Sequence, residues 1–190
     1  MEIMNIAVCT DKWFVMPTGV MMYSVCVNNP DVDIVFHVIH DDSVTSKNRN
    51  DLEETLAEFK GKSIAFYHVD VTKFPSFPNI IIGHGITQAT YYRLMLSEIL
   101  PETIHKVLYL DGDIIARHSL LPLWNMDLKG YAVGAVPDLL EIEYSKEFSS
   151  RLNYPPQYGY FNSGVLLVNL DYWREHRVVR DFVRYLQEHA

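Results

Sequence analysis

The N-terminal part of the chain alternates between short apolar runs and longer segments with helical spacing. The runs Asn5–Thr10, Asp33–His40 and Ile64–Val69 are apolar at most positions, which is typical of strands covered on both faces. Helical segments separate them. Strands that alternate with helices indicate a parallel sheet with helices on both faces, so we predict an α/β fold.

Two helices are predicted between these strands. Pro17–Val27 has a proline near its start and one set of residues at helical spacing, namely Val20, Tyr23, Ser24 and Val27. Ser43 or Thr45 can cap the next helix, which ends by Gly61. Its inward-facing residues are expected to be Leu52, Leu56 and Phe59.

The rest of the chain begins with a loop rich in proline and glycine, Val71–Gly85. The further expected elements are, in order, a helix over Thr87–Ile99 ended by Pro101, strands over Val107–Leu110 and Tyr131–Val136, a helix over Glu141–Leu152, an aromatic loop over Tyr154–Gly159, a strand over Val165–Val168 and a helix from Asp171 onward. The sheet is therefore mostly parallel but can be mixed, and residues 1–190 are expected to form one domain.

Composition limits the function. The net charge is −8, with 24 acidic and 16 basic residues, which argues against a nucleic-acid partner. No apolar stretch is long enough for a membrane span, and the N-terminus lacks a basic region before an apolar segment. Cys9 and Cys26 lie in apolar segments and lack the spacing of a metal site. We expect them to be buried thiols in a reducing compartment. We therefore expect a cytoplasmic protein.

The strongest chemical signal is a pair of carboxylates after the Val107–Leu110 run. Asp111 and Asp113 are separated only by Gly112, and residues two apart on an extended chain point to the same side. Such a pair suits Mg²⁺ or Mn²⁺, which commonly share their ligands with substrate phosphates. The alternative is a tight Asp-Gly turn without a ligand.

Polar residues also follow other strands. They are Thr10 and Asp11, Asp138, and a turn formed by Asn162, Ser163 and Gly164, which precedes its strand. Ligands of open α/β sheets bind beyond the carboxyl ends of the strands. The sequence has neither a G-x-G-x-x-G motif after the first strand nor a Walker A motif, so an ordinary Rossmann cofactor site and a P-loop are not expected.

These features occur within five segments that resemble family 8 glycosyltransferases, the group of glycogenin and of bacterial lipopolysaccharide galactosyl- and glucosyltransferases. The segments run in family order and are Ile6–Asp11, Thr90–Leu94, Lys106–Asp113, Pro122–Trp124 and Tyr160–Leu170. The resemblance implies a GT-A fold, a UDP-sugar donor, Mn²⁺ (or Mg²⁺) and hexose transfer with retention of configuration. It also implies a glycan or lipid-linked glycan acceptor.

The resemblance further assigns roles to single residues. It implies that Asp111 and Asp113 hold a metal ion with the UDP diphosphate, and that Asp11 contacts the uridine beside the backbone of Cys9 and Thr10. Phe14 stands where the family stacks an aromatic ring on uracil, although Phe14 can also be a core residue with Trp13 in that role.

The sugar side of the site is assigned in the same way. Arg93 matches an arginine near the donor sugar, and without the resemblance it would be an exposed surface arginine. Asp138 matches an acid that binds sugar hydroxyls; the alternative is a helix cap before Leu139. Asn162, Ser163 and Gly164 match the turn that flanks the sugar, with Gly164 permitting close backbone approach.

The sequence departs from the family pattern at its end. The family's third metal ligand is a histidine in an H-x-x-G-x-x-K-P-W segment, and the chain reaches Ala190 without one. We therefore expect either a fragment or a shortened site, and any peripheral membrane contact would belong to that segment. A catalytically impaired UDP-sugar-binding domain is the main alternative to an enzyme. A nucleotidyltransferase is a third hypothesis, disfavoured because Cys9–Trp13 has no glycine-rich loop.

Overall fold

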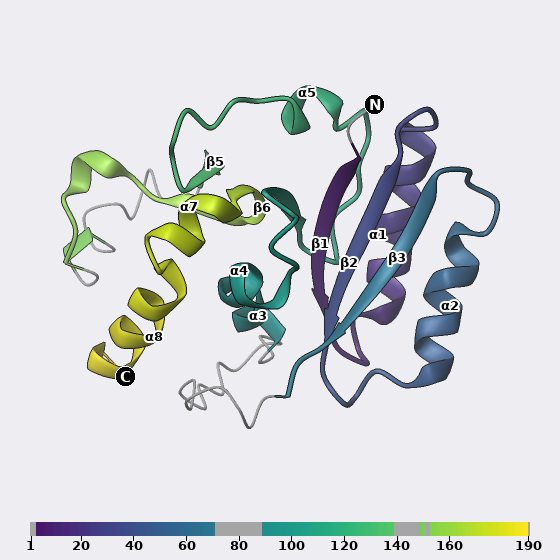
Figure 1. Ribbon diagram of the computed structural model, residues 1–190, viewed down its shortest axis with the longest axis horizontal. Coiled ribbons are helices and arrows are strands. Elements are labelled where there is room, and N and C mark those ends of the chain that lie inside the picture. Colours follow the sequence, from purple (N-terminus) through teal and green to yellow (C-terminus); the bar gives the residue numbers. More distant parts are fainter. Residues whose placement is uncertain (1–2, 71–88, 139–148, 151–152, 190) are drawn as a thin grey trace.

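A computed structural model describes residues 3–70, 89–138, 149–150 and 153–189. Six strands form one sheet in the order β3-β2-β1-β4-β6-β5. Helices lie on both faces of the sheet (Figure 1). The predicted α/β class and the two-sided covering of the sheet are therefore confirmed.

The strands are β1 (Met4–Thr10), β2 (Ile34–His40), β3 (Lys62–His68), β4 (Lys106–Leu110), β5 (Val133–Pro137) and β6 (Phe161–Asn169). β1 pairs in parallel with β2 and β4, and β2 pairs in parallel with β3. β6 is antiparallel to both of its neighbours, β4 and β5. Because β6 alone is reversed, its first residues lie at the sheet edge where β1 and β4 end.

Helices α1 (Val15–Asn28) and α2 (Ser46–Leu56) cover one face of the sheet. Met21, Met22 and Val25 of α1 are fully buried against the even-numbered positions of β1 and β2. Thr45, not Ser43, caps α2: its hydroxyl accepts a hydrogen bond from the Asn48 amide. Ser43 instead accepts a hydrogen bond from the Lys12 amide, so it ties the loops after β1 and β2 together.

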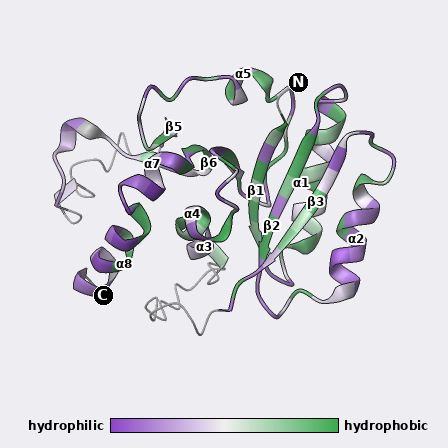
Figure 2. Ribbon diagram, in the orientation of Figure 1, coloured by the Kyte–Doolittle hydropathy of each residue, from purple (hydrophilic) through white to green (hydrophobic). Residues whose placement is uncertain are grey.

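The opposite face is covered by two groups of helices. The first group is α3 (Ala89–Tyr92), the 3₁₀ turn η2 (Arg93–Met95) and α4 (Leu96–Ile99), and the second is α7 (Leu170–Glu175) and α8 (Val178–His189). Tyr92, Leu96 and Trp173 pack here against the odd-numbered positions of β1 and β4. Figure 2 shows hydrophobic residues along the strands and α1, and many hydrophilic ones on α2 and α8.

The structure shows which face of α1 is buried and corrects two predictions about helices. The face of α1 marked by Val20, Tyr23 and Val27 is not packed on the sheet, since each is about half exposed. α1 carries apolar residues on two sides, so spacing alone could not choose the buried one. The helix predicted over Thr87–Ile99 contains a 3₁₀ turn within its described part, and the C-terminal helix begins at Leu170 and breaks before Val178, where Arg177 has a φ of 53°.

The remaining predictions concern strand β5 and the segments that connect the larger elements. α5 (Leu121–Trp124) and the 3₁₀ turn η3 (Pro156–Tyr158) are short elements that the pattern did not predict, η3 lying within the expected aromatic loop. The predicted strand over Tyr131–Val136 is β5, shifted by two residues at its start. The loop Val71–Gly85, and the helix over Glu141–Leu152 apart from Ser149 and Ser150, lie outside the described residues.

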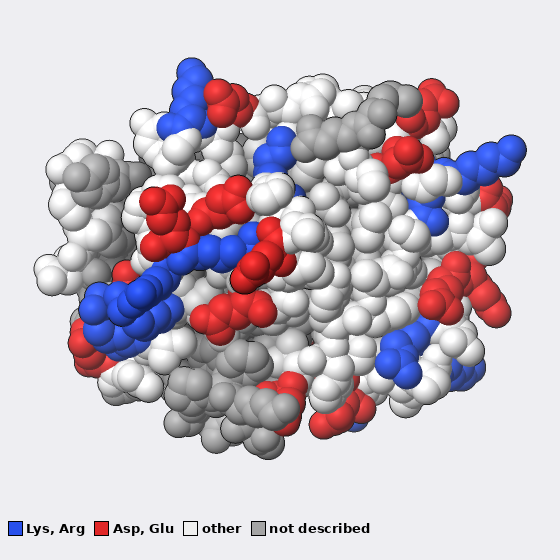
Figure 3. All heavy atoms as spheres, in the orientation of Figure 1, with Lys and Arg blue, Asp and Glu red and all other residues white. Residues whose placement is uncertain are grey.

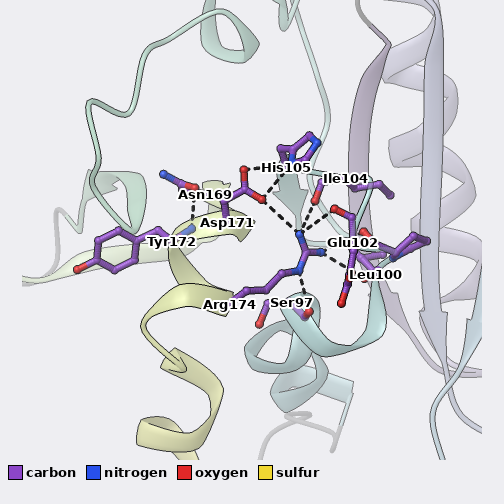
Figure 4. Close-up of polar contacts among 10 residues, drawn as sticks. Ser97, Leu100, Glu102, Ile104, His105, Asn169, Asp171, Tyr172 and Arg174 are labelled. Atoms are coloured by element: carbon purple, nitrogen blue, oxygen red, sulfur yellow. Dashed lines mark hydrogen bonds and ion pairs between the residues drawn. The ribbon is translucent and has the colours of Figure 1, made fainter.

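Arg174 joins the two helix groups (Figure 4). Its guanidinium donates hydrogen bonds to main-chain carbonyls at the end of α4 and in the loop before β4, those of Ser97, Leu100, Pro101, Glu102 and Ile104. Asp171 lies 3.5 Å from the same guanidinium and 3.0 Å from His105. A helix end leaves carbonyls without intrahelical partners, and Arg174 supplies donors to this one from α7.

His37 is a buried histidine of β2 held by two neutral partners. Its Nε2 lies 3.0 Å from Asn5 Oδ1, which can only accept, so Nε2 donates and Nδ1 accepts from the Tyr67 hydroxyl at 3.0 Å. Burial lowers the pKa of His37 from 6.5 to about 4, because it disfavours the charged imidazolium.

We expect this histidine to make the fold sensitive to acid. Between pH 6.5 and 4 the unfolded chain binds a proton that the folded chain does not, so stability falls as pH decreases, by about 3 kcal/mol in all. Urea unfolding of the parent and of His37→Gln across this range measures the difference. The exposed His118→Gln is the control, and parallel pH curves for the parent and His37→Gln would contradict the expectation.

Two surface properties complete the description. None of the helices in the described ranges is long and apolar enough to cross a membrane. On the face in Figure 3, basic side chains gather over α8 beside acidic ones. Asp181 of α8, for example, lies 3.2 Å from Arg184 and 3.9 Å from Arg180.

Candidate active site

A cavity of about 320 Å³ opens where β1 and β4 end. α1 begins on one side of it and α3 on the other. Its walls are formed by Cys9, Thr10, Asp11, Phe14, Ala89, Thr90, Arg93, Tyr109, Asp111, Gly112, Asp113 and Ser163. The position agrees with the rule that open α/β sheets bind ligands beyond the carboxyl ends of their strands.

Most residues singled out from the sequence meet in this cavity, from four separate parts of the chain. Three do not line it: Asp138, Asn162 and Gly164. Asp138 is half-buried after β5, and its amide donates to the Tyr160 carbonyl across the β5–β6 pair. Asn162 and Gly164 lie on either side of Ser163 in β6.

Asp111 and Asp113 reach the cavity through a tight turn at the end of β4. Asp111 is partly buried and Asp113 is exposed. Gly112 is buried against α1, where a Cβ atom would lie 2.6 Å from Thr18 Oγ1. A larger residue at this position would push the turn away from α1, so the close contact with Thr18 helps to set where both carboxylates lie.

Arg93 neutralises the inner carboxylate. Its side chain is only 11% exposed, and Nη1 lies 3.1 Å from Asp111 Oδ1. Nη1 also donates to the Ser163 carbonyl over 2.8 Å, and Nε donates to the Thr90 carbonyl. The interpretation of Arg93 as an exposed surface arginine is therefore wrong, because these acceptors draw it into the cavity.

Asp11 and the aromatic residues after it form the wall nearest α1. Asp11 Oδ1 accepts hydrogen bonds from the Trp13 and Phe14 amides, and these bonds form the turn that leads into α1. The other oxygen, Oδ2, takes no part in this turn. Phe14 lines the cavity. Trp13 is 72% exposed, with Lys12 Nζ 4.8 Å from its ring, and borders a separate hollow between α1 and α2. Of the two rings, Phe14 is thus the one positioned to meet a ligand.

Asn162, Ser163 and Gly164 are part of strand β6, not of a turn before it. The prediction of a turn was wrong because Asn162 and Ser163 are polar and exposed, unlike the buried run that follows. The Asn162 side chain accepts a hydrogen bond from the Gly164 amide, and the Gly164 carbonyl accepts one from the Asp111 amide. β6 therefore holds Asp111 directly.

Two further groups at the cavity stay protonated. Burial raises the pKa of the Cys9 thiol to about 12, and the Asp111 carboxylate adds to this while Arg93 opposes it. Burial also raises the pKa of Tyr109 well above its usual value, helped by Cys9 and Asp111. Cys9 is therefore a neutral wall residue and Tyr109 a hydrogen-bond donor.

The carboxylate pair fits a divalent cation that is shared with a phosphate group. Both residues offer hard oxygen ligands, and Tyr109 and Arg93 contact Asp111 at Oδ1. Within the described ranges no group of three or more His, Cys, Asp or Glu side chains could hold a metal ion. Among the described residues, the candidate protein ligands at this cavity are therefore Asp111 and Asp113.

Ala89, Thr90 and Tyr109 also line the cavity, and none of them has a role predicted from the sequence. Thr90 can be recognised as a cavity residue only from the tertiary structure of the segment that carries Arg93. Tyr109 could have been found, because it lies two residues before Asp111 and so points to the same side of β4.

We expect Gly164→Ala to weaken ligand binding without unfolding the chain. A Cβ atom at position 164 would lie 2.8 Å from Asp111 Oδ2 and would displace that carboxylate. With UDP and Mn²⁺, the ligands that the family resemblance implies, binding measured by calorimetry should weaken by about tenfold or more. Gly19→Ala is the control, since its Cβ would make only ordinary contacts at 3.6 Å. Equal affinities for all three proteins would show that Asp111 has room to move.

The fold and this cavity define an α/β protein with a carboxylate pair and an arginine at the carboxyl edge of its sheet. The description "Glycosyl transferase family 8" matches residues 5–190, and the chain belongs to this family. Its structure superposes with a TM-score of 0.87 on a galactosyltransferase, LgtC, solved with donor and acceptor sugar analogs, at 33% identity. That match covers 98% of this chain and 65% of LgtC, and it confirms the predicted GT-A fold.

Two curated relatives match nearly the whole chain. General stress protein A of Bacillus subtilis is 30% identical over 190 residues, which cover 99% of this chain and 63% of the relative. Lipopolysaccharide 1,3-galactosyltransferase of Salmonella typhimurium is 30% identical over 185 residues, 97% of this chain and 53% of the relative. The chain thus spans between about half and two thirds of the length of these two relatives.

Proposed function

We propose that residues 1–190 form a nucleotide-sugar-binding domain of a retaining glycosyltransferase. The enzyme would move a hexose, glucose or galactose, from a UDP-sugar to a hydroxyl of a glycan or lipid-linked glycan such as lipopolysaccharide. The observation that carries the proposal is the convergence of Asp111, Asp113 and Arg93 on one cavity at the carboxyl edge of the sheet. The relatives that act on lipopolysaccharide support the choice of acceptor.

The chain's own residues would divide the donor between them. Cys9, Thr10 and Asp11 would line the uracil pocket and Phe14 would stack on the base, at the wall next to α1. Asp111 and Asp113 would hold Mn²⁺ or Mg²⁺, which when bound neutralises charge on the diphosphate as UDP leaves. No general base is assigned to the described residues.

The sugar would lie on the β6 side of the cavity. Arg93 is fixed there by Ser163, so its guanidinium would face the donor near the bond that breaks. Asn162 and Ser163 would flank the sugar, and Gly164 would let the chain approach it. Asp138, although it does not line this cavity, would accept hydrogen bonds from sugar hydroxyls at the far end of a bound donor.

The test is incubation of the chain with UDP-glucose, UDP-galactose and Mn²⁺, with UDP release and UDP-sugar binding measured in parallel. Metal-dependent binding with release of UDP supports the enzyme. Binding without release favours the alternative, a catalytically impaired UDP-sugar-binding domain. An absence of metal-dependent binding would contradict both.

A further inference from the structure

Tyr109 is a buried tyrosine of β4 whose hydroxyl lies beside the carboxylate pair. Its side chain is 1% exposed, and its hydroxyl donates a hydrogen bond to Asp111 Oδ1 over 2.7 Å. The two residues are two apart on the chain, so the strand directs both to the same side. Because the ring is enclosed by the core, the hydroxyl has little freedom to leave this acceptor.

Two other contacts depend on the same ring and the same carboxylate. The Arg93 guanidinium lies 4.9 Å from the centroid of the Tyr109 ring and 3.1 Å from Asp111 Oδ1. On the other side, Gly164 leaves room for Asp111 Oδ2 that a Cβ atom would fill. Tyr109 and Arg93 therefore both hold Oδ1, and Gly164 limits where Oδ2 can lie.

We propose that Tyr109 is a positioning residue, whose hydroxyl holds Asp111 so that Oδ2 is presented to a divalent cation. This rests on the proposed function, in which Asp111 is a metal ligand. A carboxylate that must rotate into place loses conformational freedom on binding the ion, whereas one already held by a hydrogen bond does not. In this role Tyr109 acts through Asp111.

The variant Tyr109→Phe isolates the hydroxyl, because it removes one oxygen and keeps the ring beside Arg93. Tyr67→Phe is the matched control. It also removes a hydroxyl that bonds one partner, His37 Nδ1, on the same face of the sheet but on β3, away from Asp111. Thermal melts of both variants report any general loss of stability.

The measurement is titration of each protein with Mn²⁺ alone, followed by the electron paramagnetic resonance signal of the free ion. We expect Tyr109→Phe to bind Mn²⁺ about tenfold to a hundredfold more weakly than the parent, with Tyr67→Phe unchanged. UDP binding in the presence of EDTA should be equal in all three proteins, because it does not use the metal.

Equal or tighter Mn²⁺ binding by Tyr109→Phe would overturn the positioning role while leaving the metal site in place. An equal loss in Tyr67→Phe would overturn it as well, since the effect would then belong to the fold. A parent protein that binds no Mn²⁺ would overturn the metal site of the proposed function together with this inference.

Discussion

Asp113→Asn should abolish the contribution of Mn²⁺ to UDP binding. Asp113 is exposed at the cavity and takes no part in the Tyr109–Arg93 contacts on Asp111, so its substitution leaves those contacts intact. Asparagine keeps the shape and one oxygen but removes the negative charge that a divalent cation requires. Since loss of a group that merely supports a ligand costs about tenfold to a hundredfold in metal affinity, loss of the ligand's charge should cost at least as much.

Calorimetric titration of UDP with and without Mn²⁺ measures this effect. In the parent the metal should raise UDP affinity, and in Asp113→Asn the two titrations should coincide. Asp127→Asn provides a control, because it also removes an exposed carboxylate. Asp127 does not line the cavity, and its side chain accepts a hydrogen bond from the Lys129 amide. If the metal still strengthens UDP binding to Asp113→Asn, the sequence Asp-Gly-Asp is a turn and not a metal site.

Arg174→Met should destabilise the fold more than any surface change. The substitution keeps the length of the aliphatic stem but removes donors from carbonyls at the end of α4 and before β4 (Figure 4). Partly buried carbonyls without donors are costly, and several are affected together, so we expect a loss of about 3–4 kcal/mol in the free energy of unfolding.

Urea unfolding of the parent, Arg174→Met and Arg180→Met compares this arginine with an exposed one on α8. Arg180 is 63% exposed and lies 3.9 Å from Asp181, so its loss should change stability by less than about 0.5 kcal/mol. Equal midpoints for the two variants would mean that solvent replaces the Arg174 contacts. Arg174→Lys should be intermediate, because an ammonium group reaches fewer of the carbonyls.

The class of fold was predictable because its signals are local. Continuous apolar runs such as Asn5–Thr10 and Asp33–His40 can be stable only where both faces are covered, and the spacing of helices between them requires parallel pairing. For the same reason Asp111 and Asp113 could be placed together at a strand end from their separation alone. Thr45 as a helix cap and Cys9 and Cys26 as buried thiols are likewise confirmed.

Contacts between distant segments were decided only by the tertiary structure. Which face of α1 is buried depends on where β1 and β2 lie, because both faces carry apolar residues. The residues around Arg93 in the sequence do not distinguish it from a surface arginine. Its partners Asp111 and Ser163 lie 18 and 70 positions further along the chain, and only the fold places them beside it.

The reversed direction of β6 is the clearest case. Periodicity indicates that Val165–Val168 is a buried strand, but it does not say in which direction this strand pairs with β4. Since β6 runs antiparallel to β4, Ser163 enters the cavity from the start of its strand, while Asp111 enters from the end of its own. The sequence by itself therefore determined most of the larger elements and the carboxylate pair. Pairing across the sheet decided which other side chains surround them, because that pairing depends on contacts between residues far apart in the chain.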